Sequence, residues 1–231
     1  MPRFLALAYA RPTMPRTRAA TILLTGFEPF DGDTVNPSWL VAQALHGQLL
    51  DGARVEALCL PCAFGQSLDM LQQAIDHGQA RLVLALGLAG ARAELSVERV
   101  AVNIDDARIA DNVGAQPIDV PVVGGAPAAY FSTLPIKAMV QQMLLAGVPA
   151  AVSQTAGTFV CNHVFYGLMH HLRRRRKVGA GFMHLPLLPE QAGLQGLAGL
   201  DLETQCRGVR AALLAALKTG PDLRLTGGAI A

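Results

Sequence analysis

The sequence predicts a single-domain α/β fold of three layers, α/β/α, with a mostly parallel, twisted sheet and helices on both faces. Hydrophobic residues make up 52% of the 231 residues and charged residues only 16%. This balance suits strands that are covered on both faces. Short continuous apolar runs, several of them closed by glycine, alternate with helical segments along the chain. Parallel strands joined by helices through right-handed crossovers produce such an alternation.

Length, charge and cysteine content narrow the class of protein further. A chain of 231 residues can bury a full core without disulfides or metal. The net charge of +2 is too small to indicate a nucleic-acid partner. Four irregularly spaced cysteines do not form a disulfide framework. No apolar run approaches the roughly 18 residues needed to cross a bilayer, so we expect no membrane partner.

The first 19 residues are expected to lie outside the folded domain. Met14-Pro-Arg repeats the opening Met1-Pro-Arg, and the short apolar run between them weakly resembles a signal peptide. We interpret residues 1–19 as a disordered extension or a start-site artefact. Residues 20–231 are then the single domain.

The first half of the chain begins with a central strand, Thr21–Phe27, an apolar run that contains Gly26. Pro37 suits the first turn of a helix over residues 38–49, and Asn36 suits its N-cap. The other elements expected in this half are strands over 54–60, 81–87 and 98–104 and a helix over 64–77.

The second half opens with a long excursion over residues 105–133, which carries turn signals throughout and room for a short hairpin. Strands and helices then resume their alternation. We expect helices over 134–147, from 159 or 160 onward and over 202–218, and strands over 149–153 and 179–186.

Cys161 is predicted to lie in the first turn of a helix directly behind a strand. Helix N-termini carry unpaired N–H groups and partial positive charge, which favour a thiolate. A thiolate in such a position is reactive, with a pKa below the ordinary value of about 8.5. The alternative is that Cys161 is a small buried hydrophobic residue.

His184 is the best-placed base for such a nucleophile. It comes late in the strand over 179–186, and functional groups gather at the carboxyl ends of strands in α/β sheets. A Cys–His pair needs a third group to orient the imidazole. Glu98 is one candidate, although spacing alone favours a surface carboxylate paired with Arg99. The competing carboxylates are Asp105, Asp106 and Asp111, and the alternative for His184 is a core histidine.

Three other motifs have simpler explanations than function. Cys59-Leu-Pro-Cys62 has redox or half-zinc spacing, but no second pair completes a metal site. The basic run 173–177 suits the end of a helix and solvent, and no aromatic residue interrupts it. The glycines at 87 and 90 lack the spacing of a dinucleotide-binding loop.

Several motifs follow one another in a fixed order between about Thr21 and at least Gln191. The motifs are Thr25-Gly-Phe-Glu-Pro-Phe, Asn36-Pro-Ser-Trp, Glu98-Arg-Val-Ala-Val-Asn, Asp106-Ala-Arg-Ile-Ala-Asp-Asn, Gly124-Gly-Ala-Pro-Ala-Ala-Tyr, Ser153-Gln-Thr-Ala-Gly-Thr-Phe-Val-Cys-Asn-His-Val-Phe-Tyr-Gly-Leu-Met and Gly181-Phe-Met-His-Leu-Pro-Leu-Leu-Pro-Glu-Gln. Together they resemble the pyroglutamyl-peptidase I family of cytosolic cysteine peptidases.

The resemblance implies a catalytic triad of Cys161, His184 and Glu98, and so selects the acidic member that spacing left open. It implies a peptide substrate with an N-terminal pyroglutamyl (5-oxoprolyl) residue, cleaved through an acyl-enzyme. It also implies no metal and no cofactor, a cytoplasmic location and a homo-oligomer, a tetramer in bacterial relatives.

The same resemblance implies a substrate slot. The flat, uncharged pyroglutamyl ring suits an aromatic pocket, and the matching positions here are Phe27, Phe30 and Phe159, with Arg108 near the active site. One position departs from the family, which usually has Gln where this chain has Leu88. Loss of that hydrogen bond is expected to weaken binding by roughly 1 kcal/mol.

Two alternatives belong to other functional classes. The first is a transferase similar to nucleoside phosphorylases, whose fold is related in architecture; phosphate-dependent cleavage would indicate it. The second is a binding protein that lost activity through Leu88, which would bind ligand tightly without turnover.

Overall fold

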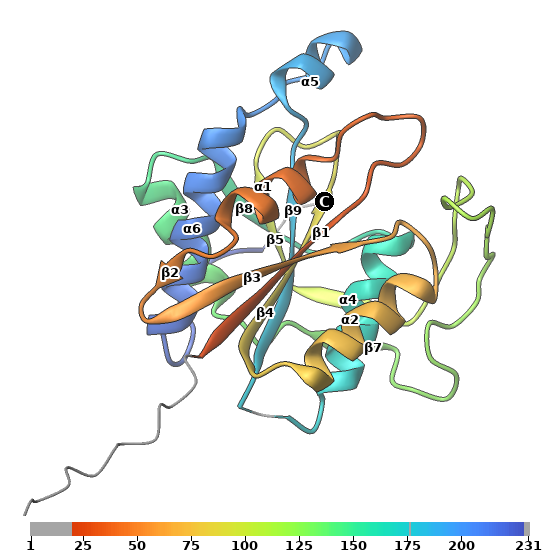
Figure 1. Cartoon of the computed structure of the whole chain (residues 1–231), viewed down its shortest axis with the longest axis horizontal. Helices are drawn as coiled ribbons and strands as arrows, with labels where there is room; N and C mark the ends of the chain where they lie inside the picture. Colours follow the sequence, from red (N-terminus) through yellow and green to blue (C-terminus); the bar gives the residue numbers. More distant parts are fainter. Residues whose placement is uncertain (1–19, 176, 229–231) are drawn as a thin grey trace, which may run out of the picture.

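A seven-stranded sheet runs through the centre of this computed structural model, with helices on both faces (Figure 1). The structure describes residues 20–175 and 177–228, and the expected extension over 1–19 lies outside them. The strand order is β2-β3-β1-β4-β9-β5-β8. The strands are β1 (Thr21–Phe27), β2 (Leu49–Leu50), β3 (Ala53–Leu60), β4 (Ala80–Leu88), β5 (Leu95–Glu98), β8 (Ala150–Ser153) and β9 (Gly179–Leu185).

The sheet is mostly parallel, as predicted, with two antiparallel pairings: β2 with β3, and β5 with β9. Because β5 and β8 are parallel to each other, both run opposite to β9. Each strand of the β1, β4 and β9 group is buried along almost its whole length. This explains why these strands are continuous apolar runs in the sequence.

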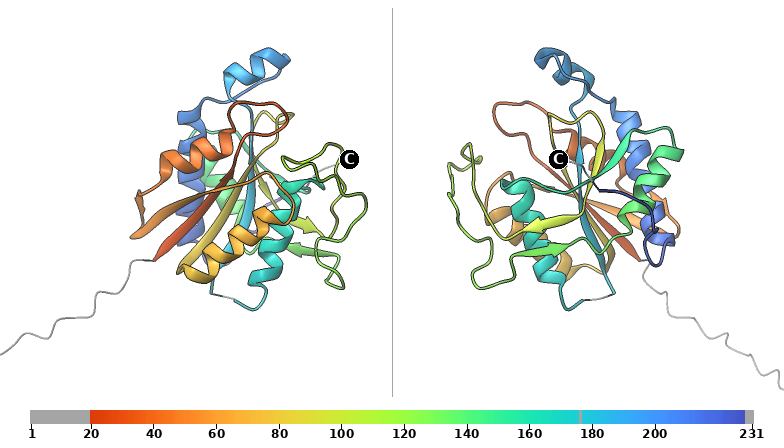
Figure 2. Two further views of the ribbon diagram at one scale, coloured as in Figure 1. Left: turned by 45° about the vertical axis from the view of Figure 1, so that its right-hand side comes forward. Right: turned by 180° about the vertical axis from the view of Figure 1, so that it is seen from behind.

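The helices form two layers, one on each face of the sheet (Figure 2), and each layer packs on the sheet through its own hydrophobic core. One core joins the sheet to α1 (Pro37–Leu45), α3 (Ile136–Leu145) and α6 (Leu202–Lys218). The other joins the opposite face to α2 (Gln66–His77) and α4 (Val160–Leu172). The short α5 (Pro189–Gln195), which the sequence did not predict, stands apart at the top of Figure 1.

The helix predicted over 38–49 ends earlier, at Leu45. Gly47 adopts a positive φ of 78°, a conformation that glycine tolerates, and its N–H bonds to the carbonyl of Val55. The chain then turns back, and β2 pairs with β3. Pairing of β2 with β3 therefore takes the place of the last helical turn that the sequence predicted.

The strand predicted over 98–104 is also wrong, because the chain leaves the main sheet at Arg99. Glu98 ends β5, and β6 (Val100–Val102) pairs instead with β7 (Ala129–Phe131) in a separate two-stranded ribbon. The side chain of Asn162 bonds both the N–H and the carbonyl of Val102, which fixes this ribbon against α4. Residues 103–128 form the expected excursion outside the α2 and α4 layer (Figure 2).

Candidate active site

A buried histidine and a buried carboxylate meet where β9 lies beside β5. Ser96 is the register partner of His184 in this antiparallel pair. His184 Nδ1 lies 2.7 Å from Glu98 Oε1, and neither side chain has appreciable exposure. A carboxylate only accepts hydrogen bonds, so Nδ1 carries the proton and donates it. The other ring nitrogen, Nε2, is left free to accept a proton.

Arg92 is a third member of this cluster that the sequence did not reveal. Its Nη1 donates to Glu98 Oε1 at 2.7 Å, and its Nη2 donates to the carbonyl of Thr155 at 2.9 Å. Arg99 does not pair with Glu98; it bonds Gln154 and the carbonyl of Gly227 instead. The surface ion pair considered from the sequence is therefore absent from the described contacts. No pattern in the sequence links Arg92 to Glu98, because the contact depends on how the loop after β4 folds back.

Cys161 lies in the first turn of α4, as predicted, and faces the same side of the sheet as His184. A Cβ added to Gly87 would lie 2.8 Å from Cys161 Sγ and 2.8 Å from the ring of Phe182. Gly87 is the register partner of His184 in the parallel pair β4–β9. The rings of Phe182 and His184 are 4.9 Å apart between centroids. Sulfur and imidazole therefore lie on the same face of the sheet, and the Phe182 ring lies near both.

The described contacts include no hydrogen bond between Cys161 and His184. Catalytic hydrogen bonds are often long before substrate binds, and they tighten only in the reacting complex. The glycine at position 87 leaves the space in which such an approach can take place.

The electrostatics of the two groups correct one expectation. Burial raises the pKa of the Cys161 thiol; the neighbouring Cys62 and Glu98 raise it further, and Arg92 opposes them. The prediction of a lowered thiol pKa is wrong, because desolvation of the charged form outweighs the nearby positive charge. Burial likewise lowers the pKa of His184, against the raising effect of Glu98, while Arg92 lowers it further. Both the Cys161 thiol and the His184 imidazole are thus favoured in their neutral forms.

The three aspartates that competed with Glu98 are engaged elsewhere or exposed. Asp105 Oδ2 lies 2.8 Å from Nδ1 of the buried His163. Asp111 accepts hydrogen bonds from the backbone N–H groups of Phe64, Val113 and Ala115. Asp106 is exposed. Of the four carboxylates, Glu98 alone has a hydrogen bond to His184 among the described contacts.

The residues expected to form the slot are brought together only in part. A cavity of about 360 Å³ is lined by Phe30, Leu88 and Arg108 together with Leu187 and other residues. The ring of Phe159 lies 6.1 Å from that of Phe30 between centroids. Phe27 is only 2% exposed and belongs to the hydrophobic core beneath them, so it supports the aromatic wall and does not line the cavity.

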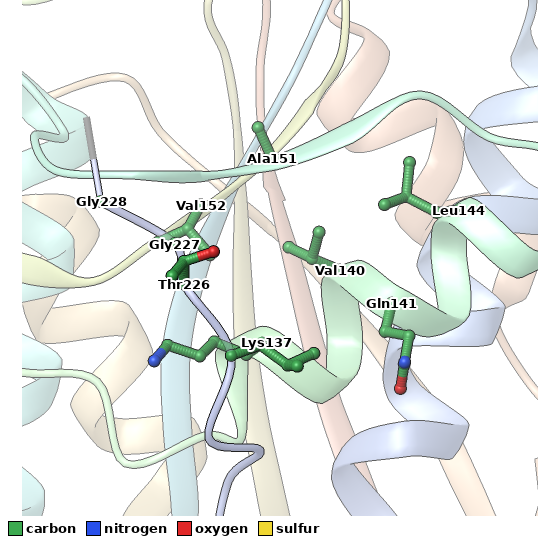
Figure 3. A pocket seen from close by; sticks show the side chains of 10 residues that line it. Lys137, Val140, Gln141, Leu144, Ala151, Val152, Thr226, Gly227 and Gly228 are labelled. Atoms are coloured by element: carbon green, nitrogen blue, oxygen red, sulfur yellow. The ribbon is translucent and has the colours of Figure 1, made fainter. Parts of the chain in front are cut away.

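A second hollow, of about 440 Å³, lies at the β8 edge of the sheet, between α3 and residues 225–228 (Figure 3). Among the described residues that line it, Lys137 is the only charged one, and none is a cysteine, a histidine or a carboxylate. This hollow therefore lacks the groups that the Cys161 region brings together.

The remaining sequence motifs keep their simpler explanations. Cys59 and Cys62 are both free thiols. Burial, reinforced by Glu28 and Asp111, raises the pKa of Cys62 to about 12, which disfavours the thiolate that redox or metal chemistry needs. In the basic run, Arg175 forms an ion pair with Asp76 at 2.7 Å.

Comparison with known proteins identifies the family. A model of the pyroglutamyl peptidase family matches residues 20–219. The chain belongs to that family. The pyrrolidone-carboxylate peptidase of Cupriavidus necator is 57% identical over 211 residues, which are 90% of this chain and 98% of that protein. The enzyme of the same name from Erwinia tasmaniensis is 56% identical over 209 residues, with 90% and 98% covered.

Solved structures of the pyroglutamyl peptidase family share the fold. The pyroglutamyl peptidase I of Bacillus amyloliquefaciens superposes with a TM-score of 0.88 at 40% identity, covering 90% of this chain and all of that one. The pyrrolidone carboxyl peptidase of Thermococcus litoralis gives a TM-score of 0.85 at 34% identity, covering 90% and 99%. In the described part of the chain, no helix combines the length and the hydropathy that a membrane span requires.

Proposed function

We propose that this chain is a cysteine peptidase that removes an N-terminal pyroglutamyl residue from peptides. Membership of the pyroglutamyl peptidase family supports this reaction. The observations that carry it are that the sulfur of Cys161 lies over Gly87, the register partner of His184, and that a buried carboxylate holds the His184 imidazole in one tautomer. Nucleophile, base and orienting group are the parts that acyl transfer by a thiol needs.

In the first step, His184 Nε2 takes the proton of Cys161 as the sulfur attacks the pyroglutamyl carbonyl carbon. A base is required because the thiol pKa is raised by burial, and a neutral imidazole is able to act as one. The carbonyl oxygen becomes an oxyanion next to the start of α4. No side chain caps that helix, so the N–H groups of its first turn, including that of Cys161, are available to stabilise the oxyanion.

In the second step, the imidazolium of His184 gives its proton to the departing amine, and a thioester to Cys161 remains. Water then attacks the thioester, His184 takes a proton from that water, and the thiol is restored as pyroglutamate leaves. Glu98 stabilises the imidazolium in both halves of the reaction and fixes the ring orientation. The proposed catalytic residues are therefore Cys161, His184 and Glu98.

The proposed substrate slot has an apolar aromatic wall, whereas the adjoining cavity also carries Asp31, Asp33 and Arg108. Phe30 and Phe159 would contact the faces or edges of the pyroglutamyl ring, Phe27 would support them from the core, and Leu88 and Arg108 would line the adjoining cavity. Against the aromatic wall, a free α-ammonium would lose its hydration at a cost of several kcal/mol. The slot therefore favours the cyclised, uncharged N-terminus over an ordinary one.

The test is hydrolysis of a pyroglutamyl chromogenic amide and of the matching prolyl amide. We expect turnover of the first alone, inhibition by iodoacetamide, and loss of turnover in Cys161→Ala. Turnover by Cys161→Ala would refute the assignment. Cleavage that depends on added phosphate and ignores iodoacetamide would favour the phosphorylase-like alternative, and tight binding without turnover would favour the binding protein.

We further propose that the chain works as a homo-oligomer in the cytoplasm. Leu144, which is 54% exposed, lines the hollow of Figure 3, and the next residue of α3, Leu145, is 73% exposed; these exposed leucines support contact with another copy. A functional free thiol belongs in a reducing compartment. Light scattering that gives four times the monomer mass would support a tetramer, and a monomer at working concentration would exclude it.

The match of the family model to residues 20–219 supports a peptidase domain that begins at residue 20. A chain that starts at residue 20 should therefore keep the activity of the 231-residue chain. Loss of folding or turnover in that shortened chain would contradict this boundary.

A further inference from the structure

The carboxylate of Glu98 is completely buried and yet carries few hydrogen bonds. Its two donors, Arg92 Nη1 and His184 Nδ1, both reach Oε1, each at 2.7 Å. Among the described residues, Oε2 has no hydrogen-bond partner. Burying a carboxylate is costly unless an opposite charge compensates it. Arg92 is the one permanently charged group that bonds Glu98 within the described part of the chain.

Arg92 also connects the acid to the segment that leads into α4. Its Nη2 donates to the carbonyl of Thr155, which lies between β8 and the helix that carries Cys161. One planar guanidinium therefore fixes two elements at once, and the side chain is only 26% exposed. Arginine suits this role because its donors are rigidly spaced and its charge is permanent.

We propose that Arg92 is a positioning residue for the reaction: it compensates the buried charge of Glu98 and thereby keeps His184 a neutral base with a free Nε2. This inference rests on the proposed cysteine peptidase function. Without Arg92, the buried carboxylate would have His184 as its only ionisable partner. His184 would then acquire a proton to compensate the charge, and an imidazolium cannot take a proton from Cys161.

The groups that face His184 determine the direction of the effect. Glu98 comes from β5 and Arg92 from the loop after β4. The same two groups, together with Cys62, act on Cys161 of α4. Arg92 lowers the pKa of both His184 and Cys161. Its removal should therefore raise both, so that the base is protonated and the thiol is harder to ionise at neutral pH.

The first experiment measures kcat/KM for a pyroglutamyl amide against pH in Arg92→Gln, Arg92→Lys and wild type. In Arg92→Gln we expect the acidic limb to move up by about one pH unit, as loss of a nearby cation predicts. Arg92→Lys keeps the charge but not the two-point geometry, so its acidic limb should stay in place while kcat falls. Arg99→Gln is the matched control, because Arg99 follows Glu98 in the chain but bonds Gln154 and Gly227. It should change neither the position of the acidic limb nor kcat.

The second experiment does not depend on turnover. NMR titration of the His184 ring in Cys161→Ala, with and without Arg92→Gln, should show a higher midpoint when Arg92 is absent. A midpoint that does not move when Arg92→Gln is added, or an acidic limb of Arg92→Gln that stays at its wild-type position while kcat alone drops, would overturn the proposal. If Arg92→Gln does not fold, Arg92→Met removes the charge but retains an apolar stem. Failure of the pyroglutamyl reaction itself would appear in wild type, so the two failures are distinguishable.

Discussion

Replacing Gly87 by alanine tests the geometry on which the proposed chemistry depends. The added Cβ would lie 2.8 Å from Cys161 Sγ and 2.8 Å from the ring of Phe182. Ordinary contacts begin near 3.4 Å, so the sulfur has to retreat by at least about 0.6 Å. A misplacement of about 1 Å costs roughly 10²-fold in rate, or about 2.7 kcal/mol in the barrier. Crowding of the Phe182 ring should destabilise the fold by about 1–3 kcal/mol.

The assay compares kcat/KM on a pyroglutamyl amide, the rate of alkylation by iodoacetamide and the free energy of unfolding. Gly181→Ala is the matched control, because its Cβ would lie 2.6 Å from Ser132 Oγ and 2.7 Å from a Leu134 methyl, away from the sulfur. It should lose stability but retain kcat. If Gly87→Ala folds and keeps kcat/KM within about twofold of wild type, the sulfur does not react in the space above position 87, and the reasoning fails.

Three further predictions follow from individual contacts. Burial lowers the pKa of His184 below 6.5, so near pH 6 the unfolded chain binds a proton at this ring more readily than the folded chain does. The free energy of unfolding in urea should therefore fall as the pH drops through 6.5 toward 5, and it should fall less steeply in His184→Gln. Leu88→Gln should lower KM for the pyroglutamyl amide about fivefold, the equivalent of one hydrogen bond of about 1 kcal/mol, whereas an unchanged KM would show that position 88 makes no polar contact with substrate. Asn36→Ala should cost about 1 kcal/mol of stability in thermal unfolding, because the Asn36 side chain caps α1 by accepting from the N–H of Ser38; a loss below about 0.3 kcal/mol would contradict that role.

The local pattern around Cys161 was sufficient to predict its place in the fold. An apolar run, a glycine turn and a helical segment follow one another in the sequence, and α4 does begin at Val160. Local patterns of the same kind predicted the full lengths of β1 and α6. It failed where distant partners decide the structure, as at Leu49–Leu50, which pairs with β3, and at Val100–Val102, which pairs with β7.

The expectation that the site would form where strands end at one edge of the sheet was also incomplete. Glu98 ends β5, but β5 runs antiparallel to β9, so the carboxyl ends of these two strands point in opposite directions. The acid and His184 meet because the strands pass each other in register near Ser96. Strand direction and order are properties of the whole sheet, and spacing along the chain does not encode them.

What the sequence by itself determined is the set of chemical groups: a thiol at a helix start, a histidine late in a strand, and several carboxylates among which spacing could not choose. The tertiary structure decided which groups meet. His184 and Glu98 are 86 residues apart in the chain, and Arg92 reaches Glu98 only because its loop folds back over β5. Burial, which no local pattern specifies, then sets the charge states by raising the pKa of Cys161 and lowering that of His184. Desolvation depends on everything packed around a group, and for that reason only the folded chain fixes it.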